Sequence, residues 1–288
     1  MRALVVLGAM VALLPGAARG ATLPRVAPHL PTREDPALAA ALARIGSAYP
    51  GQAGIFVEDL RTGTFAGWNE DAQLPAASTV KIGLVAEGIR RFGFGAASPI
   101  DRDLREIGEF SSNVAANDVF ARVGGREPTE AALRRLGMFS STFPEPYQLS
   151  PAEQPKKPKA KKARKTSAVG GHTRVTTARD LARALFRLQS AAAGERWATA
   201  DTELAPAQAR AALGYLSLAV PENSLLSFPA GWTHAEKDGW LDDLRATAAI
   251  AFHGGDARIV VVVAYRPGVT LAEARALGAQ VSRAAFRR

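Results

Sequence analysis

Apolar residues recur at helical spacing in several separate stretches of the chain. After Asp35-Pro36, a side-chain cap followed by a first-turn proline, the residues Leu38, Leu42 and Ile45 fall on one stripe. Similar spacing predicts helices over 79–92, 114–123 and 128–136, and two more begin at the caps Thr177 and Thr270. The pattern therefore predicts a helical middle and one helix near each end.

Apolar runs typical of strands lie toward both ends of the chain. Residues 53–60 and 64–68 flank a short turn, and residues 244–252 and 258–265 flank the turn His253-Gly254-Gly255-Asp256. Because both ends contribute strands, we expect one sheet built from both ends. The predicted class is α+β: a mainly antiparallel sheet with N- and C-terminal helices (residues 35–77 and 220–288) and a second, all-helical half (residues 78–219).

The first twenty residues have the pattern of a secretory signal peptide. A basic start precedes the apolar run 3–14, and Ala18-Arg19-Gly20 places small residues where signal peptidase reads them. The run is too short to span a bilayer. We expect cleavage before Ala21, a periplasmic or secreted protein, and a flexible leader over residues 21–34, which are rich in proline and polar groups.

Charge and cysteine content narrow the possible functions. The chain has 288 residues, a formal net charge of +9 and no cysteine. The lack of cysteine excludes disulfides, thiolate metal ligands, a thiol nucleophile and a lipid anchor through cysteine. Two arginines of the signal peptide and a basic tract between Lys156 and Lys165 account for the whole positive excess. The rest of the chain is neutral, so we expect no nucleic-acid partner.

The basic tract belongs to residues 151–168, which are rich in proline and lysine. This self-repelling composition predicts a disordered insertion. Two interpretations stay open: a passive solvated segment, which we favour, and a weak contact with anionic polymer or lipid of the cell envelope.

Ser78-Thr79-Val80-Lys81 places a hydroxyl and an amine at the start of a predicted helix. Residues three apart share one face, and a buried lysine of lowered pKa can take the proton of a serine. Ser78 could instead simply cap the helix. However, a capping box needs Glu or Gln where Lys81 stands, and a lysine there opposes the helix dipole. Ser78 is therefore the candidate nucleophile and Lys81 the candidate base.

Two polar triplets follow in chain order. Ser111-Ser112-Asn113 opens the helix predicted at 114–123, and Lys237-Asp238-Gly239 lies just before the final hairpin. With Ser-x-x-Lys before them, these triplets resemble the pattern of class A β-lactamases and penicillin-binding proteins. The resemblance implies a β-lactamase/transpeptidase-like fold with the catalytic domain over residues 35–288. The short stretch from Ser78 to Ser111 marks a divergent member with a shortened helical half.

The resemblance also implies roles for the first two motifs. Ser78 would be acylated, with Lys81 as the base or as part of a relay to one. Ser111 would pass a proton to the leaving nitrogen, and Asn113 would bind the amide of the substrate. Ser112 stands where the family has an Asp that mainly supports the fold, so the change is expected to be structural.

The third triplet would serve the carboxylate and the carbonyl of the substrate. Lys237 would supply positive charge, and the backbone N–H of Trp240, after Gly239, would complete an oxyanion hole with that of the nucleophile. Asp238 replaces a Thr or Ser that donates a hydrogen bond in the family. An aspartate cannot donate and would repel the carboxylate, with Arg245 as the candidate to neutralise it.

Deacylation in class A β-lactamases uses a glutamate and a bound water. Glu145-Pro146 resembles the family's Glu-Pro dipeptide but comes early after Gly137, and an exposed loop acid is the competing interpretation. Glu153, beside the basic tract, is a weaker candidate. Glu145 is therefore a tentative catalytic residue, and we expect weak β-lactam hydrolysis with a long-lived acyl-enzyme.

The resemblance thus implies a secreted serine hydrolase acting on β-lactams or related cyclic and peptide amides. A D-alanyl-D-alanine carboxypeptidase or other peptide or ester hydrolase, and a non-hydrolysing penicillin-binding envelope protein, remain alternatives. We expect a monomer whose partner is a small β-lactam or a peptidoglycan-type peptide. No cofactor or metal is implied, and ligand spacing is absent among His29, His172, His234 and His253.

Overall fold

The computed structural model describes residues 23–24, 26–149, 153 and 173–287. The expected signal peptide, residues 1–20, lies outside this part, as does the expected insertion, residues 151–168, apart from Glu153. None of the described helices is long and apolar enough to cross a membrane.

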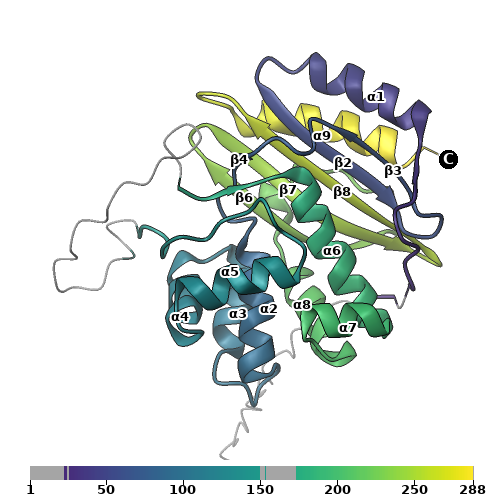
Figure 1. Cartoon of the computed structure of the whole chain (residues 1–288). Helices are drawn as coiled ribbons and strands as arrows, with labels where there is room; N and C mark the ends of the chain where they lie inside the picture. Colours follow the sequence, from purple (N-terminus) through teal and green to yellow (C-terminus); the bar gives the residue numbers. More distant parts are fainter. Residues whose placement is uncertain (1–22, 25, 150–152, 154–172, 288) are drawn as a thin grey trace, which may run out of the picture.

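A six-stranded sheet organises the described chain, and its strands come from both ends of the sequence (Figure 1). The spatial order is β1-β3-β2-β8-β7-β6, with β1 parallel to β3 and every other neighbour antiparallel. The mainly antiparallel sheet is therefore confirmed. The strands are β1 (Arg33–Glu34), β2 (Gln52–Asp59), β3 (Thr64–Trp68), β6 (Thr233–Leu241), β7 (Leu244–His253) and β8 (Asp256–Tyr265).

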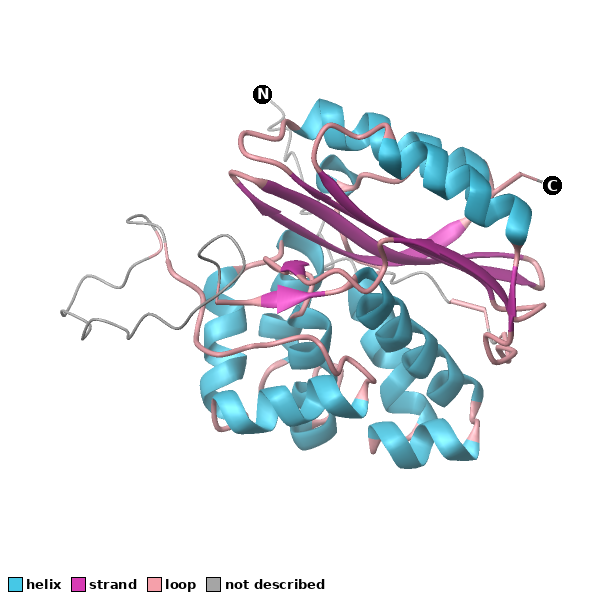
Figure 2. Cartoon of the chain, turned by 45° about the horizontal axis from the view of Figure 1, so that its top comes forward, coloured by secondary structure: helices cyan, strands magenta, loops and turns pink. Residues whose placement is uncertain are grey.

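Two helices, α1 (Pro36–Ser47) and α9 (Leu271–Ala285), cover one face of this sheet (Figure 2). Asp35 caps α1 by accepting hydrogen bonds from the next two free N–H groups, each at 3.0 Å. Thr270 and Glu273 form a reciprocal capping box at α9. Both helices bury their apolar stripes against the sheet, as the helical spacing predicted.

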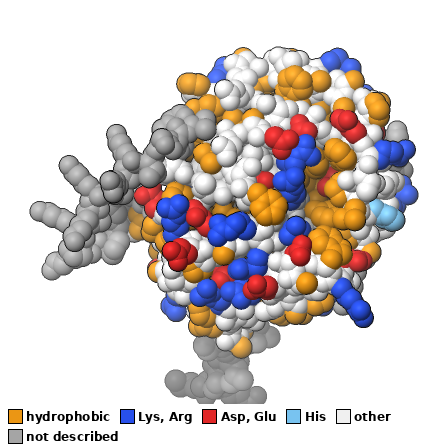
Figure 3. All heavy atoms as spheres, viewed as in Figure 1, with side chains coloured by type: hydrophobic (Ala, Val, Ile, Leu, Met, Phe, Trp, Pro, Cys, Tyr) orange, Lys and Arg blue, Asp and Glu red, His pale blue; other side chains and the backbone are white. Residues whose placement is uncertain are grey.

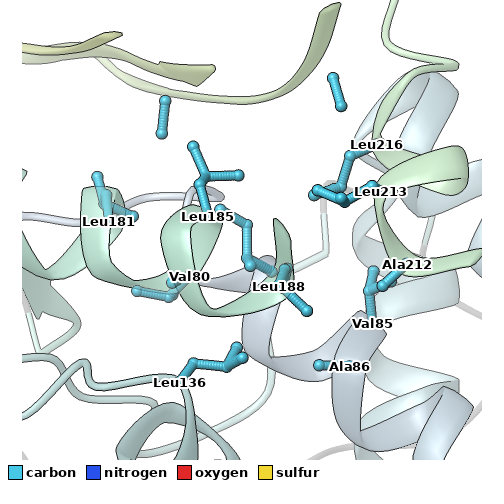
Figure 4. Packing of buried hydrophobic residues seen from close by; sticks show 14 of the residues in the cluster. Val80, Val85, Ala86, Leu136, Leu181, Leu185, Leu188, Ala212, Leu213 and Leu216 are labelled. Atoms are coloured by element: carbon cyan, nitrogen blue, oxygen red, sulfur yellow. The ribbon is translucent and has the colours of Figure 1, made fainter. Parts of the chain in front are cut away.

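The other face of the sheet packs against α6 (Ala178–Ala193), and the remaining helices gather beyond it (Figures 1 and 2). Leu181, Leu185 and Leu188 of α6 lie between the sheet and this helical half (Figure 4). The other members of the half are α2 (Lys81–Phe92), α3 (Asp101–Phe110), α4 (Asn113–Arg122), α5 (Arg126–Arg135), α7 (Arg196–Thr202) and α8 (Pro206–Leu216). The short 3₁₀ turn Pro221–Asn223 contacts α9 instead, because Arg275 donates to its carbonyls.

A second, two-stranded sheet connects distant parts of the chain. Strand β4 (Leu74–Pro75) pairs antiparallel with β5 (Val175–Thr176). Ala76 N then donates to Arg174 O at 3.0 Å. The segment that begins at Thr173 is thereby fixed alongside the turn that carries Ser78.

Three features differ from the expectation. Helices α3, α7 and α8 were not predicted. The triplet at 237–239 precedes the β7–β8 hairpin as expected, but it lies inside a strand, β6, that was not predicted. Its buried acids and amine, Glu236, Lys237 and Asp238, hide the apolar alternation by which a strand is found.

The third difference concerns residues 21–34, which were expected to form a flexible leader. Arg33–Glu34 forms β1, and His29 N donates to Leu60 O at 2.7 Å. Val26 is buried in the larger core. The described end of this segment therefore packs against the domain.

Candidate active site

The turn that carries Ser78 follows β4 directly and contains a strained residue. Ala77 has a φ of +45°, in the left-handed region that non-glycine residues rarely occupy. Thr79 fixes the turn through Oγ1, which donates to Ala76 O at 2.6 Å. Helix α2 begins at Lys81 with Val80 as its N-cap, so Ser78 does not cap the helix. The half-buried Ser78 lies on the wall of a cleft instead.

Lys81 is fully buried and held by the second motif. Its Nζ donates to Ser111 O at 2.5 Å, to Asn113 Oδ1 at 2.8 Å and to Ser112 O at 3.3 Å. The same Nζ lies 4.2 Å from the centroid of the Tyr147 ring. The amine is thus fixed one helical turn from Ser78 by groups that are mostly uncharged.

The electrostatic environment of Lys81 disfavours its ammonium form. Burial, together with the charges of Lys237 and Arg174, lowers the pKa of Lys81 well below its usual value, while Glu153 opposes the shift. Burial also lowers the pKa of Lys237 to about 8, against the charges of Asp238 and Glu236. As a neutral amine, Lys81 can donate only two of these three hydrogen bonds, and its lone pair can then accept a proton from a nearby hydroxyl.

The second motif connects α3 to α4 and is fixed by its own backbone. Ser111 ends α3 in the left-handed conformation, with φ of +56°. Its buried Oγ makes no hydrogen bond within the described residues. Ser112 Oγ caps α4 by accepting from Ala115 N at 3.2 Å. Asn113 uses Oδ1 to bind Lys81, which leaves its amide N–H groups for a ligand.

Strand β6 runs beside the nucleophile turn. A Cβ atom added to Gly239 would lie 3.1 Å from Ser78 N, 3.1 Å from Ala76 O and 3.1 Å from the Thr79 side chain. Only glycine allows this approach without displacement. The contact places β6 beside Ser78 N, and Trp240 directly follows Gly239 on this strand.

These segments enclose a cleft of about 370 Å³. Its walls come from the Ser78 turn, the α3–α4 junction, the loops on either side of the undescribed stretch and the end of β6. The lining residues are Ala77, Ser78, Phe110, Ser111, Ser112, Asn113, Tyr147, Glu153, Thr173, Arg174, Trp240 and Leu241. The described residues contain no cluster of three His, Asp or Glu side chains that could hold a metal ion.

Comparison with known proteins assigns this chain to a family. The model of the β-lactamase enzyme family matches residues 37–104 and 103–288. The chain belongs to the β-lactamase enzyme family. No curated protein sequence matches it.

Solved structures agree with the family in fold. PBP-A matches 88% of this chain and 97% of its own, with 18% identity and a TM-score of 0.69. A β-lactamase from Xanthomonas campestris pv. campestris covers 86% of this chain and 96% of its own, with 20% identity and a TM-score of 0.65. An ancestral class A β-lactamase covers 86% and 98%, with 21% identity and a TM-score of 0.64. The β-lactamase-like, penicillin-binding fold predicted from the motifs is confirmed.

This β-lactamase-family protein departs from the expected site at Glu145. The Glu145 carboxylate accepts from Thr173 Oγ1 at 3.1 Å, and its side chain is not part of the cleft wall. Tyr147 lies beside Lys81 instead. Its hydroxyl donates to Ala77 O at 2.9 Å, and its N–H donates to Asn117 Oδ1 at 2.7 Å. Burial raises the pKa of Tyr147 to about 12, so its hydroxyl stays protonated.

Asp238 and Arg245 also differ from expectation. The buried Asp238 carboxylate accepts from Thr247 Oγ1 and does not line the cleft, so it does not face a substrate carboxylate as we expected. Burial raises the pKa of Asp238. Arg245 Nη1 donates to the carbonyls of Leu241 and Leu244 and makes no ion pair with Asp238. The buried Lys237 Nζ donates to Asp238 O at 3.1 Å.

Sequence reasoning missed Tyr147, Arg174 and Phe110 as cleft residues and ranked Glu153 low. Arg174 reaches the cleft only because β5 pairs with β4, a contact between two-residue strands that leave no periodic signal. Phe110 was detectable as the residue before Ser111. Phe110 is 58% exposed and lines the cleft.

Proposed function

We propose that this β-lactamase-family protein is a serine hydrolase that forms an acyl-enzyme with β-lactams or related amides through Ser78. The observation that carries the proposal is the buried Lys81 amine, held by Asn113 Oδ1 and two carbonyls one turn from Ser78, with its pKa lowered by burial. An amine in this state can take the Ser78 Oγ proton as the oxygen attacks the carbonyl.

The remaining atoms of the acylation step have candidates in the cleft. Ser78 N and Trp240 N would donate to the carbonyl oxygen as it becomes negative. Ser111 Oγ, buried and without a hydrogen bond in the described chain, would give its proton to the leaving nitrogen and take up in exchange the proton that Lys81 received from Ser78. Lys237, buried on β6, would supply positive charge. Asn113 would donate its amide N–H to the acyl group.

We infer that deacylation is slow. It requires a water held by a base on the other side of the ester. Tyr147, a protonated phenol whose hydroxyl is committed to Ala77 O, lies beside Lys81 where such a base would act. One similar structure, a PBP-A mutant with a TM-score of 0.69, is an acyl-enzyme complex with penicillin G. Weak turnover and an isolable acyl-enzyme are the expected outcome.

Export to the periplasm or medium belongs to the proposal, on the signal-peptide pattern of residues 1–20. A peptidoglycan-type peptide is the second candidate substrate. It is a candidate because the serine–lysine pair needs no glutamate to open a peptide bond.

The test is labelling of the mature protein by fluorescent penicillin, with release of the label followed over hours. We expect stoichiometric labelling, a mass adduct on the peptide that contains Ser78, and slow release. Ser78→Ala should not be labelled, and Ser47→Ala, at the exposed end of α1, is the matched control. A stable adduct that persists in Ser78→Ala would disprove the proposed nucleophile. Fast release would disprove the slow deacylation.

A further inference from the structure

Arg174 is a cation on the cleft wall that has no acidic partner among the described residues. Arg179, by contrast, pairs with Glu70 and Asp71 at 2.7 Å and 2.8 Å. Arg174 lines the cleft and makes no such ion pair in the described chain. An arginine that faces a cleft without a counter-ion favours an anionic ligand.

The guanidinium of Arg174 is held rigidly. Its Cζ lies 3.9 Å from the ring centroid of Tyr147 and 4.7 Å from that of Phe143. Nη2 donates to Glu145 O at 2.7 Å, while the buried Nε has no hydrogen-bond partner within the described residues. A guanidinium carries five N–H donors. Stacking thus fixes the plane of the Arg174 guanidinium. Most of its N–H donors have no hydrogen-bond partner among the described residues.

The position of Arg174 assigns it to one side of the scissile bond. The Ser78 turn lies between two segments: Ala76 O approaches Gly239 of β6, and Ala76 N donates to Arg174 O at 3.0 Å. Under the proposed function, Ser111 and Lys237 serve the leaving group. Arg174 stacks on the same Tyr147 ring that contacts Lys81 Nζ, and under the proposed function this wall of the cleft faces the side chain of the acyl group.

We propose that Arg174 is a specificity-determining residue that binds a carboxylate on the acyl side of the substrate. This inference rests on the proposed function and names its substrate class: β-lactams or peptides whose acyl portion carries an anionic group. Glu153 is the other charged residue on the described cleft wall. It carries the opposite sign, so a competing preference for an ammonium group becomes an outcome of the test.

Two penicillins that differ by a single carboxylate make the test sharp. Carbenicillin carries a carboxylate on the acyl side chain, benzylpenicillin lacks it, and ampicillin carries an ammonium there. We expect the second-order rate of acylation to be highest for carbenicillin, lower for benzylpenicillin and lowest for ampicillin. Arg174→Gln should reduce the carbenicillin-to-benzylpenicillin ratio about tenfold, the usual scale for a lost hydrogen bond to a charged group. Arg174→Lys should keep an intermediate ratio.

The ratio is the readout because Arg174 also lowers the pKa of Lys81, and its loss would change both rates together. Arg134→Gln, an exposed arginine on α5 away from the cleft, is the matched control and should leave the ratio unchanged. Equal rates for the two penicillins in the wild type, or a preference for ampicillin, would overturn the inference while leaving acylation by Ser78 intact.

A binding measurement covers the case in which no penicillin acylates the protein and the proposed function fails. Calorimetry with Ser78→Ala should show carbenicillin binding about tenfold tighter than benzylpenicillin, on the same hydrogen-bond scale. The preference should vanish in the double variant with Arg174→Gln. If it persists there, Arg174 is not the carboxylate-binding residue, and equal binding of both penicillins to Ser78→Ala rejects the inference.

Discussion

Tyr147 is the residue that separates this cleft from an efficient hydrolase under the proposed mechanism. Its ring contacts the Lys81 amine and its hydroxyl is committed to Ala77 O. Its backbone is fixed on both sides by Asn117, which binds Tyr147 N at 2.7 Å and Tyr147 O at 2.8 Å. A different side chain at this position would keep the backbone and change only the chemistry beside Lys81.

Tyr147→Glu should therefore shorten the lifetime of the acyl-enzyme. A carboxylate beside Lys81 can hold and activate a water, and one well-placed base contributes roughly 10²–10⁴-fold. We expect at least a tenfold rise in the rate of label release after pulse labelling with fluorescent penicillin. Tyr147→Gln, similar in size but without a base, should not show that rise. Equal release from both variants would contradict the role given to this position.

Ser78 and Lys81 became candidates from spacing alone, because residues three apart at the start of a helix share one face. Their catalytic roles stay predictions. Glu145 was misplaced for the opposite reason. A loop has no periodicity, so the two-residue difference between Glu145 and Tyr147 decides which side chain reaches Lys81 and leaves no trace in the sequence. Asp238 was misjudged for a similar reason. Which face of a strand a side chain points to depends on the strand register. The buried charged residues of β6 break the apolar alternation from which that register is predicted.

At the level of elements, the close approach of β6 to the Ser78 turn determines whether two N–H donors converge. Gly239→Ala would place a Cβ atom 3.1 Å from Ser78 N and Ala76 O, both backbone atoms that move only with their segments. We expect the second-order rate of penicillin acylation to fall by roughly tenfold to 10²-fold, the scale of a misplacement of about 1 Å. Thermal stability should change little.

Gly255→Ala is the matched control, because no heavy atom lies within 4 Å of the added Cβ in the β7–β8 turn. Its acylation rate should equal that of the wild type. An unchanged rate in Gly239→Ala would show that β6 does not contribute to the oxyanion hole.

The elements found from sequence are those with local end signals. Helices α1, α6 and α9 begin at Asp35, Thr177 and Thr270, whose side chains accept backbone hydrogen bonds as predicted. Helix α3 has no side-chain cap and is largely polar. Ile100, Leu104 and Ile107 keep helical spacing and are buried in the core, but this short pattern among polar residues was overlooked.

At the scale of the molecule, the charges that stand out are inside it and not on the face seen in Figure 3. On the face shown in Figure 3, acidic and basic side chains of the described residues are interspersed. The notable charges are internal. Glu58 of β2 is 2% exposed, its Oε1 has no hydrogen-bond partner in the described chain, and burial, then the charge of Asp59, raises its pKa to about 8.

This burial gives stability a definite pH dependence. Between the ordinary glutamate pKa and about 8, the folded protein keeps the Glu58 proton that the unfolded chain loses. The contribution of this group to stability is therefore present in acid and falls as pH rises, by up to about 1.4 kcal/mol per pH unit.

Glu58→Gln should remove that dependence, so the variant should gain stability relative to the wild type between pH 5 and pH 8. Urea unfolding at both pH values measures the difference. Glu34→Gln, at an exposed position of β1, is the control and should show no such gain. A difference between Glu58→Gln and the wild type that is the same at both pH values would refute the buried, protonated state.

The order of strands in the sheet also has a consequence for how the chain acquires its structure. Strand β2 pairs with β8 from Gln52 opposite Tyr265 to Asp59 opposite Arg258, so the central ladder joins the two ends of the polypeptide. During synthesis, the hairpin β2–β3 leaves the ribosome long before its partner exists. Such distant pairing raises contact order and slows folding. The nucleophile turn packs against Gly239 of β6. It can therefore acquire its final shape only after most of the chain has been made.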